Sequence, residues 1–254
     1  RTGIALSDSK RSLIVGRFKK RVQLHGLASF TDYYHFITAH TNSELQVVIN
    51  LLTTNETYFF REEKHLNFLL ETILPAASKL NFRVWSAASS SGEEAYSLAM
   101  IIADSTYPGY WEVVGSDISD AVLEKARHAT YALENVEQIP ERYRKKYCLK
   151  EENKGTFTFC QSLLSKVSFH RVNLMSPPTD WGKFDVIFLR NVLIYFDKNT
   201  KDRVVSTMVN KLKPNGYLIV GHAESLAVAT ERLTVIRPSV YHSINFLCVS
   251  TPCE

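Results

Sequence analysis

One short loop of the sequence combines residues that could recognise a charged small molecule. Between Ala87 and Glu94 a run of small polar residues ends in a single glycine, Gly92, followed by Glu93 and Glu94. A dinucleotide site needs several glycines there, so that backbone N–H groups can close on a pyrophosphate. Two carboxylates would repel a pyrophosphate and attract an ammonium or sulfonium group. Alternatively, both glutamates only complement the dipole of the following helix, and spacing does not choose between them as a ligand contact.

A further acid, Asp117, follows the next apolar run in the sequence GSDIS. A carboxylate at the end of the second strand of a nucleotide-binding sheet can accept hydrogen bonds from both hydroxyls of a ribose. Asp is also a good helix cap, so Asp117 alone does not decide the ligand. Together with the acidic loop, it favours S-adenosylmethionine over NAD or ATP.

No other catalytic motif competes with this interpretation. The sequence has no P-loop, no HExxH and no GxSxG motif. The four cysteines form no CxxC pair and have no histidine at zinc-ligand spacing, so we expect no metal site. Only His222, in GHAES, lies beside a strand end, and an imidazole there is more often a packing neighbour than a catalytic group.

Two segments carry polar groups that packing alone does not require. TTNETYFFRE, at 53–62, surrounds an aromatic pair with polar side chains, and RNVLIYF, at 190–196, leaves a predicted strand with Arg, Asn and Tyr in quick succession. Taken singly, an arginine in such a place is usually a structural clamp and a tyrosine a half-buried core residue.

The elements that must position these residues differ between the two parts of the chain. In the first part, apolar residues recur every four positions from Ile14 to Val22 and predict a helix that ends near Gly26. Further helices are predicted over 30–39 and 44–52, the third opening on a capping box at Ser43. No strand signal appears before residue 80.

After residue 80, short runs rich in Val, Ile and Phe alternate with amphipathic segments, which predicts a parallel sheet with helices on both faces. We expect Pro214-Asn215-Gly216 to be a turn into the fifth strand, and the tail around Pro238-Ser239 to form an antiparallel hairpin at the sheet edge. About 137–168 departs from the alternation and is expected to form a small β insertion. Ligands bind beyond the carboxyl ends of parallel strands, where the polar loops fall.

The composition is that of an ordinary globular protein of 254 residues, 45% hydrophobic and 22% charged. No apolar run approaches the about 18 residues that a membrane span needs, so we expect a cytoplasmic protein. Through Asn55 the chain has seven Lys and Arg against three Asp and Glu, an excess equal to the net charge of +4. Six of these cations lie between Lys10 and Arg21, which indicates an acidic partner there. A solvated basic helix face is the alternative.

Five motifs occur in an order and spacing that resemble the chemotaxis receptor glutamate methyltransferases, the CheR family. They are TTNETYFFRE, RVWSAASSSGEEAYS, GSDIS, FDVIFLRNVLIYFD and LKPNGYLIVGHAES, and the likeness covers nearly the whole chain. The resemblance implies an α/β fold, a Rossmann-like class I methyltransferase sheet with helices on both faces. It implies a helical receptor-docking domain over 1–56 and a methyltransferase domain over 57–254, with the β insertion inside it.

The resemblance also implies the residues of the site. Arg61 and Tyr195 are implied to lie closest to methyl transfer, and the family pattern favours Glu94 over Glu93. S-adenosyl-L-methionine would become S-adenosyl-L-homocysteine, and receptor glutamates would become methyl esters that serve sensory adaptation. The implied cofactor contacts are Asn55, Thr57, Arg61, Glu94, Asp117, Asn173, Leu174, Arg190 and Asn191.

This chemistry needs few groups, because a glutamate carboxylate is already ionised at neutral pH and requires no base. Positioning and exclusion of water would supply catalysis. We expect Arg61 to orient cofactor and carboxylate, and the Tyr195 hydroxyl to hold one carboxylate oxygen. The implied partner is the cytoplasmic helical bundle of methyl-accepting chemotaxis receptors. We expect a monomer, no nucleic acid and no membrane insertion. The expected docking residues are Lys10, Arg17, Lys20 and Arg21.

Some family members carry a Gly-x-Gly turn in the insertion that binds a C-terminal peptide tether of the receptor. Here the segment is KEENKGTFTF with a lone Gly155, so we expect tether-independent action. Two alternatives remain: a methyltransferase acting on a small molecule or RNA, and a signalling adaptor that binds the cofactor without catalysis. The first leaves TTNETYFFRE and the basic helical part unexplained. Retention of Arg61, Glu94, Asp117, Asn191 and Tyr195 argues against the second.

Overall fold

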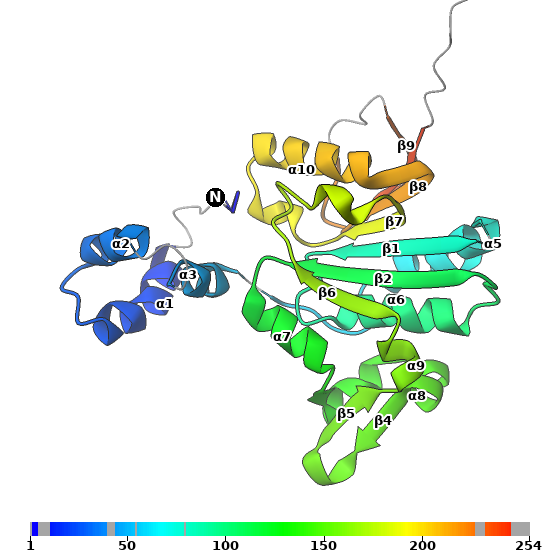
Figure 1. Cartoon of the computed structure of the whole chain (residues 1–254), viewed down its shortest axis with the longest axis horizontal. Coiled ribbons are helices and arrows are strands. Elements are labelled where there is room, and N and C mark those ends of the chain that lie inside the picture. Colours follow the sequence, from blue (N-terminus) through cyan, green and yellow to red (C-terminus); the bar gives the residue numbers. More distant parts are fainter. Residues whose placement is uncertain are drawn as a thin grey trace, which may run out of the picture.

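The computed structural model consists of a group of three helices followed by a seven-stranded sheet with further helices and a small second sheet (Figure 1). It describes residues 2–4, 11–39, 44–53, 55–78, 80–226 and 232–244. The helices are α1 (Arg11–Leu24), α2 (Phe30–Ala39), α3 (Glu44–Leu52), α4 (Glu63–Phe68), the π-helical η2 (Leu69–Ile73), α5 (Leu74–Ala76), α6 (Glu93–Asp104), α7 (Asp120–His128), α8 (Glu141–Tyr147), α9 (Gln161–Leu164) and α10 (Lys198–Lys211). The strands of the large sheet are β1 (Asn81–Ala87), β2 (Tyr110–Asp117), β6 (Val167–Arg171), β7 (Phe184–Leu189), β8 (Leu212–Val220), β9 (Leu233–Arg237) and β10 (Val240–Ser243).

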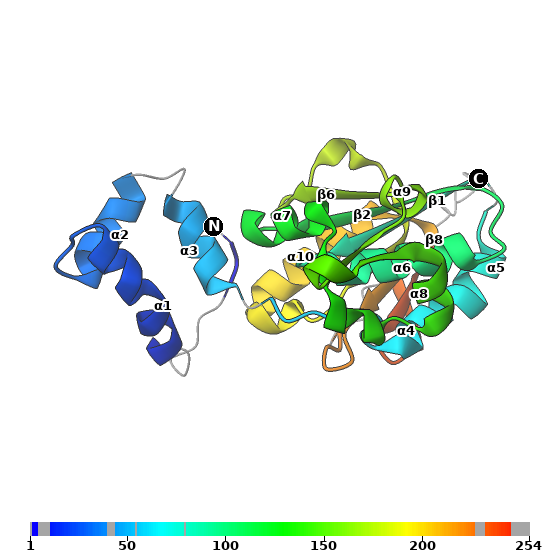
Figure 2. The same ribbon diagram turned by 90° about the horizontal axis from the view of Figure 1, so that it is seen from below.

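The first three helices confirm the prediction for the N-terminal part of the chain. The bounds of α2 and α3 are those expected, and α1 is followed by Gly26 at φ +63°, the left-handed conformation in which glycine commonly ends a helix. Both views place the three helices together at one end of the molecule (Figures 1 and 2). The capping residue Ser43 and the docking residue Lys10 lie outside the described residues.

A buried carboxylate, Glu44, joins the three helices. Its side chain is 6% exposed, and it accepts hydrogen bonds from Arg21 of α1, with Nε 2.9 Å from Oε1, and from the Tyr33 hydroxyl of α2. The Arg21 hydrogen bond lowers the pKa of Glu44 to about 2. Burial raises the pKa of Tyr33 to about 12. Arg21 therefore belongs to the internal structure of this domain.

Arg17, one of the expected docking residues, also bonds within the helical part. Its guanidinium donates to the backbone oxygens of Leu51 and Thr53 at 2.6 and 3.3 Å, so it ties α1 to the end of α3. Arg17 and Arg21 are therefore half-buried against α3, and their part in docking stays a prediction. Lys20, by contrast, is exposed, as is its neighbour Lys19.

The large sheet confirms the predicted fold class. Its strand order is β6-β2-β1-β7-β8-β10-β9, and the first five strands are parallel to one another. Alternate side chains of each strand enter two separate cores. One core contains Leu98 and Met100 of α6, and the other contains Val204 and Met208 of α10 on the opposite face. The predicted hairpin is confirmed as β9 and β10, which pair antiparallel at the edge.

Two details differ from the prediction. The segment Pro214-Asn215-Gly216 lies within β8 and not before it, because β8 begins at Leu212 and the pairing with β7 shifts register there. Asn215 at φ 60° takes up the irregularity. The small sheet begins at Tyr131, earlier than the expected 137. Its strands, in the order β3-β5-β4, are β3 (Tyr131–Ala132), β4 (Cys148–Glu151) and β5 (Thr156–Phe159).

The helical part is attached to the sheet close to the strand ends. The Gln46 amide of α3 donates to the backbone oxygen of Ile118, directly after β2, at 3.0 Å. Ile4 forms an isolated antiparallel bridge with Phe196, which the sequence did not suggest. None of the helices in the described part of the chain is long and apolar enough to cross a membrane.

Replacing Glu44 by Gln is expected to lower the free energy of unfolding by about 3 kcal/mol at pH 7, because the folded-state pKa of about 2 lies well below the ordinary 4.5. The stabilisation is complete above pH 4.5 and is lost as the pH falls towards 2. Thermal unfolding should therefore show a gap between wild type and variant that is constant down to about pH 5 and narrows below it.

The exposed carboxylate Glu71 offers a matched control, since Glu71→Gln should change the unfolding midpoint little at any pH. A gap for Glu44→Gln that stays the same from pH 7 to pH 3.5 would contradict the stabilising role of the ionised Glu44.

Candidate functional site

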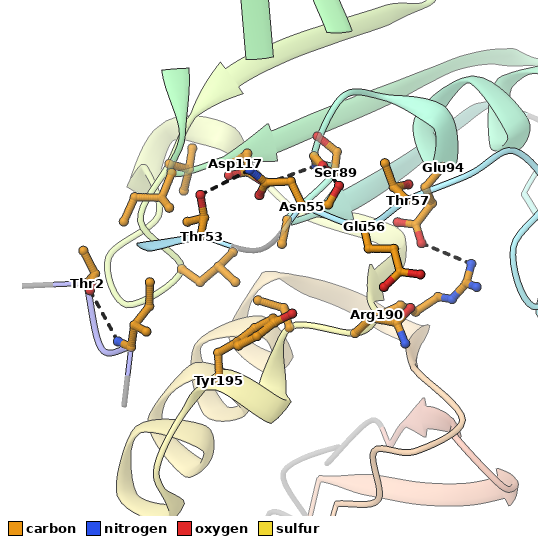
Figure 3. A pocket seen from close by; sticks show the side chains of 18 of the residues that line it. Thr2, Thr53, Asn55, Glu56, Thr57, Ser89, Glu94, Asp117, Arg190 and Tyr195 are labelled. Atoms are coloured by element: carbon orange, nitrogen blue, oxygen red, sulfur yellow. Dashed lines mark hydrogen bonds and ion pairs between the residues drawn. The ribbon is translucent and has the colours of Figure 1, made fainter. Parts of the chain in front are cut away.

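A pocket lies beyond the carboxyl ends of the parallel strands, as expected for an open sheet of this kind (Figure 3). The loops after β1, β2, β6 and β7 form most of its wall. The segment between α3 and α4 supplies a second wall, and the N-terminal Thr2 and Ile4 also line it. The pocket thus lies where the helical part meets the sheet.

The structure brings together every residue that the sequence placed at the reaction or at the cofactor. They come from five separate segments of the chain, spread over 141 sequence positions, yet all line this one pocket. The lining includes Asn55, Thr57, Arg61, Glu94, Asp117, Asn173, Leu174, Arg190, Asn191 and Tyr195.

Asp117 ends β2 with its carboxylate against the loop after β1. Its two oxygens accept hydrogen bonds from the backbone N–H groups of Ser90 at 3.1 Å and Ser119 at 2.9 Å. The residue is 7% exposed, and burial raises the pKa of its carboxyl. Ala88 and Ser90 both have positive φ, which bends the β1 loop around Asp117.

Glu93 and Glu94, between which spacing did not choose, face in different directions. Glu94 lines the pocket and accepts a hydrogen bond from Ser86 at 2.7 Å. Glu93 is buried away from the pocket, where it accepts hydrogen bonds from the Ser91 hydroxyl at 2.8 and 2.9 Å. Burial raises the pKa of Glu93. By position, Glu94 is the one available to a ligand.

Arg190, at the end of β7, is a buried cation with a side chain only 2% exposed. Its guanidinium bonds to Glu62 at 3.2 Å, to Glu94 at 3.1 Å and to the backbone oxygen of Arg61 at 2.5 Å. Figure 3 shows the link between Glu94 and Arg190 on one side of the pocket. Arg190 therefore connects the α3–α4 segment, α6 and the loop after β7.

Glu62 is a residue of the site that the sequence did not single out. Its backbone has a left-handed φ of 53°, and its carboxylate also accepts from the Asn191 side chain at 3.2 Å. Burial alone would raise its pKa, but the neighbouring His65, with Nδ1 3.2 Å from Oε2, and the charge of Arg190 hold the pKa of Glu62 well below its usual range. Its place directly after Arg61 in TTNETYFFRE was the only signal available.

Glu62, His65 and His222 offer three potential ligand atoms within 4.8 Å of one another. The Glu62 carboxylate is already matched by the guanidinium of Arg190, so an ion is not needed to explain the cluster. The expectation of no metal site stays a prediction. His222 does not line the pocket; its backbone N–H donates to Glu62 at 3.4 Å.

Arg61 and Tyr195 enter the pocket from different walls. The Arg61 guanidinium is half-buried, donates to the backbone oxygen of Glu56 at 2.8 Å and lies 5.5 Å from the centre of the Tyr58 ring. Tyr195 belongs to η6 (Leu193–Tyr195), a short 3₁₀ turn, and its ring projects into the pocket (Figure 3). The pocket thus combines the cations Arg61 and Arg190 and the phenol of Tyr195 with the acids Glu56, Glu94 and Asp117.

Two family models match the chain. The model described as CheR methyltransferase, SAM binding domain, matches residues 55–241, and the model described as CheR methyltransferase, all-alpha domain, matches residues 1–53.

Curated relatives match over almost the full length. The chain is 39% identical to a chemotaxis protein methyltransferase of Escherichia coli, over 95% of this chain and 86% of that protein. It is also 39% identical to the chemotaxis protein methyltransferase of Salmonella typhimurium, over 95% and 85% of the two chains. Chemotaxis protein methyltransferase 2 of Pseudomonas aeruginosa is 36% identical, over 94% and 88%. The chain therefore belongs to the CheR family and is an S-adenosylmethionine-dependent methyltransferase.

Proposed function

We propose that the protein transfers methyl groups from S-adenosylmethionine to glutamate side chains in the cytoplasmic helical bundle of chemotaxis receptors. The methyl esters would adjust receptor output during sensory adaptation. The observation that carries the proposal is the joint presence of Arg61 and Tyr195 in the pocket that also holds Glu94, Asp117 and Arg190. We propose that the protein acts as a monomer in the cytoplasm, where this part of the receptor lies.

The polar groups of the pocket match the parts of the cofactor. Asp117 can accept hydrogen bonds from a ribose diol, and the neighbouring Ile118 and Leu174 offer apolar contact to an adenine. Glu94 and Arg190 are suited to the ammonium and carboxylate of the amino acid part, because they supply one charge of each sign. Asn55, Thr57, Asn173 and Asn191 would complete the contacts.

Bound S-adenosylmethionine supplies an electrophilic methyl group on its sulfonium. The residues of the chain then need to hold an ionised glutamate in line with that methyl and to exclude water. Arg61 can attract and orient the carboxylate, since its guanidinium lines the pocket and is partly exposed. The Tyr195 hydroxyl can donate to one carboxylate oxygen and so fix the other towards the methyl.

The helical domain would dock on the receptor through the exposed side of α1. Arg17 and Arg21 are bound to α3 and contribute their charge from a half-buried position. Lys20 and Lys19 are exposed, and we propose them as the cations nearest to an acidic receptor surface. Gly155, at φ +64° between η4 (Glu152–Lys154) and β5, is a lone glycine, which supports action without a peptide tether.

The first test is transfer of label from methyl-tritiated S-adenosylmethionine to receptor-containing membranes of the source organism. Methyl esters release methanol in mild alkali, whereas methylated amines do not. We expect base-labile label on the receptor, reduced at least about 100-fold by Arg61→Ala, because the carboxylate would lose its only pocket-lining cation besides Arg190 among the described residues. Arg203→Ala, at an exposed arginine of α10, is the matched control.

Cofactor binding without any methyl transfer would instead support the alternative of a signalling adaptor that has no catalytic activity. Label on another substrate, or label that resists alkali, would favour a methyltransferase of different specificity.

Replacing Tyr195 by Phe should slow transfer about 10- to 100-fold at saturating cofactor, because one hydrogen bond to the reacting carboxylate is lost. The Kd for S-adenosylhomocysteine, measured by calorimetry, should change less than about twofold. Tyr34→Phe, at a 64% exposed tyrosine of α2, should leave both quantities unchanged. An unaltered transfer rate in Tyr195→Phe would remove Tyr195 from the reaction.

The KM for receptor should rise with ionic strength between 50 and 500 mM salt, because docking would depend on charge. Lys20→Gln should raise that KM about threefold at low salt and have little effect at high salt, leaving kcat unchanged. Lys183→Gln is the control, since Lys183 is also exposed but precedes β7. A KM independent of both salt and Lys20 would contradict this docking face.

A further inference from the structure

Glu224, in the GHAES motif after β8, is a buried carboxylate outside the pocket. It is 5% exposed, and its Oε2 accepts hydrogen bonds from the backbone N–H groups of Gly221 and Asn191, both at 2.8 Å. Its Oε1 accepts from the backbone N–H of Ile194 at 3.3 Å. Two of these three donors belong to the loop between β7 and α10 that carries Tyr195.

The partners of Glu224 indicate what the side chain does. Every hydrogen bond to its carboxylate within the described part of the chain comes from a backbone N–H. A buried carboxylate costs several kcal/mol to desolvate unless such donors satisfy it. Because the donors are backbone groups, the carboxylate fixes the course of the main chain, with Asn191 at a left-handed φ of 57°.

The chain is built to let Glu224 come this close. A Cβ on Gly221 would lie 2.8 Å from both Glu224 Oε2 and Asn191 Nδ2, so a larger residue would force one or both of these side chains to move. The Ser239 hydroxyl donates to the Gly221 carbonyl at 3.2 Å and holds Gly221 from the turn between β9 and β10. Glu224 thus lies beyond the carboxyl end of β8, and its side chain reaches the loop that follows the neighbouring strand β7.

We propose that Glu224 is a positioning residue for methyl transfer, which acts by fixing the turn that presents Tyr195. Glu224 bonds to Ile194, the residue before Tyr195. Phe196, the residue after Tyr195, is held by its bridge with Ile4. This inference rests on the proposed role of Tyr195 in transfer. Glu224 would therefore position the Tyr195 hydroxyl and would not contribute to binding of the cofactor.

Glu62 provides the contrast that makes the assignment specific. Glu62 bonds to the side chains of Arg190 and Asn191, which line the pocket, whereas the described partners of the Glu224 carboxylate are all backbone groups. Loss of the Glu62 carboxylate should therefore weaken binding of the cofactor product. Loss of the Glu224 carboxylate should slow transfer while the product still binds.

The test is Glu224→Gln. The amide oxygen can keep the two 2.8 Å bonds, but the amide nitrogen then faces the Ile194 N–H, donor against donor. We expect single-turnover methyl transfer at saturating cofactor to fall about tenfold, with the Kd for S-adenosylhomocysteine within about twofold. Amide hydrogen exchange in a peptide covering 193–196 should become faster. Glu124→Gln, at an exposed glutamate of α7, should change none of these.

A double-mutant cycle with Tyr195→Phe shows whether the effect passes through the phenol. If it does, the double variant should be about as slow as Tyr195→Phe alone, because the positioned group is already missing. Glu224→Asp, which keeps the charge on a shorter side chain, serves as a second variant should Glu224→Gln be poorly folded. It should show the same rise in exchange and a loss of transfer that Tyr195→Phe also masks.

The inference would be overturned if the losses of transfer rate in Glu224→Gln and Tyr195→Phe multiplied in the double variant. It would also be overturned if Glu224→Gln left the transfer rate unchanged, whether or not product binding weakened. A wild type that transfers no base-labile label would defeat the proposed function instead. In that case the exchange measurement still decides whether Glu224 fixes the turn, since unchanged exchange at 193–196 would refute it.

Discussion

The pocket depends on the burial of one positive charge, that of Arg190. A guanidinium with a side chain 2% exposed is stable only if anions and carbonyls surround it. Glu62, Glu94 and the backbone oxygen of Arg61 meet this demand from three directions. The demand fixes where the α3–α4 segment must lie relative to the sheet, and it brings Arg61 to the pocket as a consequence. Removing any one partner would leave part of the buried guanidinium without a hydrogen-bond acceptor.

Most of the fold could be predicted from the sequence because its signals are local. Helix α1 follows from apolar residues that recur every four positions, and the strands from short runs rich in Val, Ile and Phe. Prediction was wrong where tertiary pairing overrode local preference. Pro214 to Gly216 has the composition of a turn, yet β8 runs through it because Tyr217 and the residues after it pair with β7. Nor could the local sequence show that Arg21 pairs with the buried Glu44, 23 positions away.

The candidate site could be predicted in part, and the division has a physical basis. Residues such as Asp117 follow strands directly, so the edge of a parallel sheet collects them whatever the details of packing. Glu62 and Glu224 act largely through bonds to groups 30 to 160 positions away, which leave no pattern in either neighbourhood. Thr2 and Ile4 gave no signal at all. Spacing could not choose between Glu93 and Glu94, because the choice depends on the directions in which two side chains of the same helical turn point.

Residues of the helical part form one wall of the pocket, namely Thr2, Ile4, Leu52 and Thr53. The family model of the all-alpha domain ends at residue 53, but residues on its side of that boundary contribute surface to the pocket. The two domains are therefore not interchangeable modules. Exchanging the helical domain for that of a relative at this boundary would replace part of the pocket wall, so each domain depends on the other for the site.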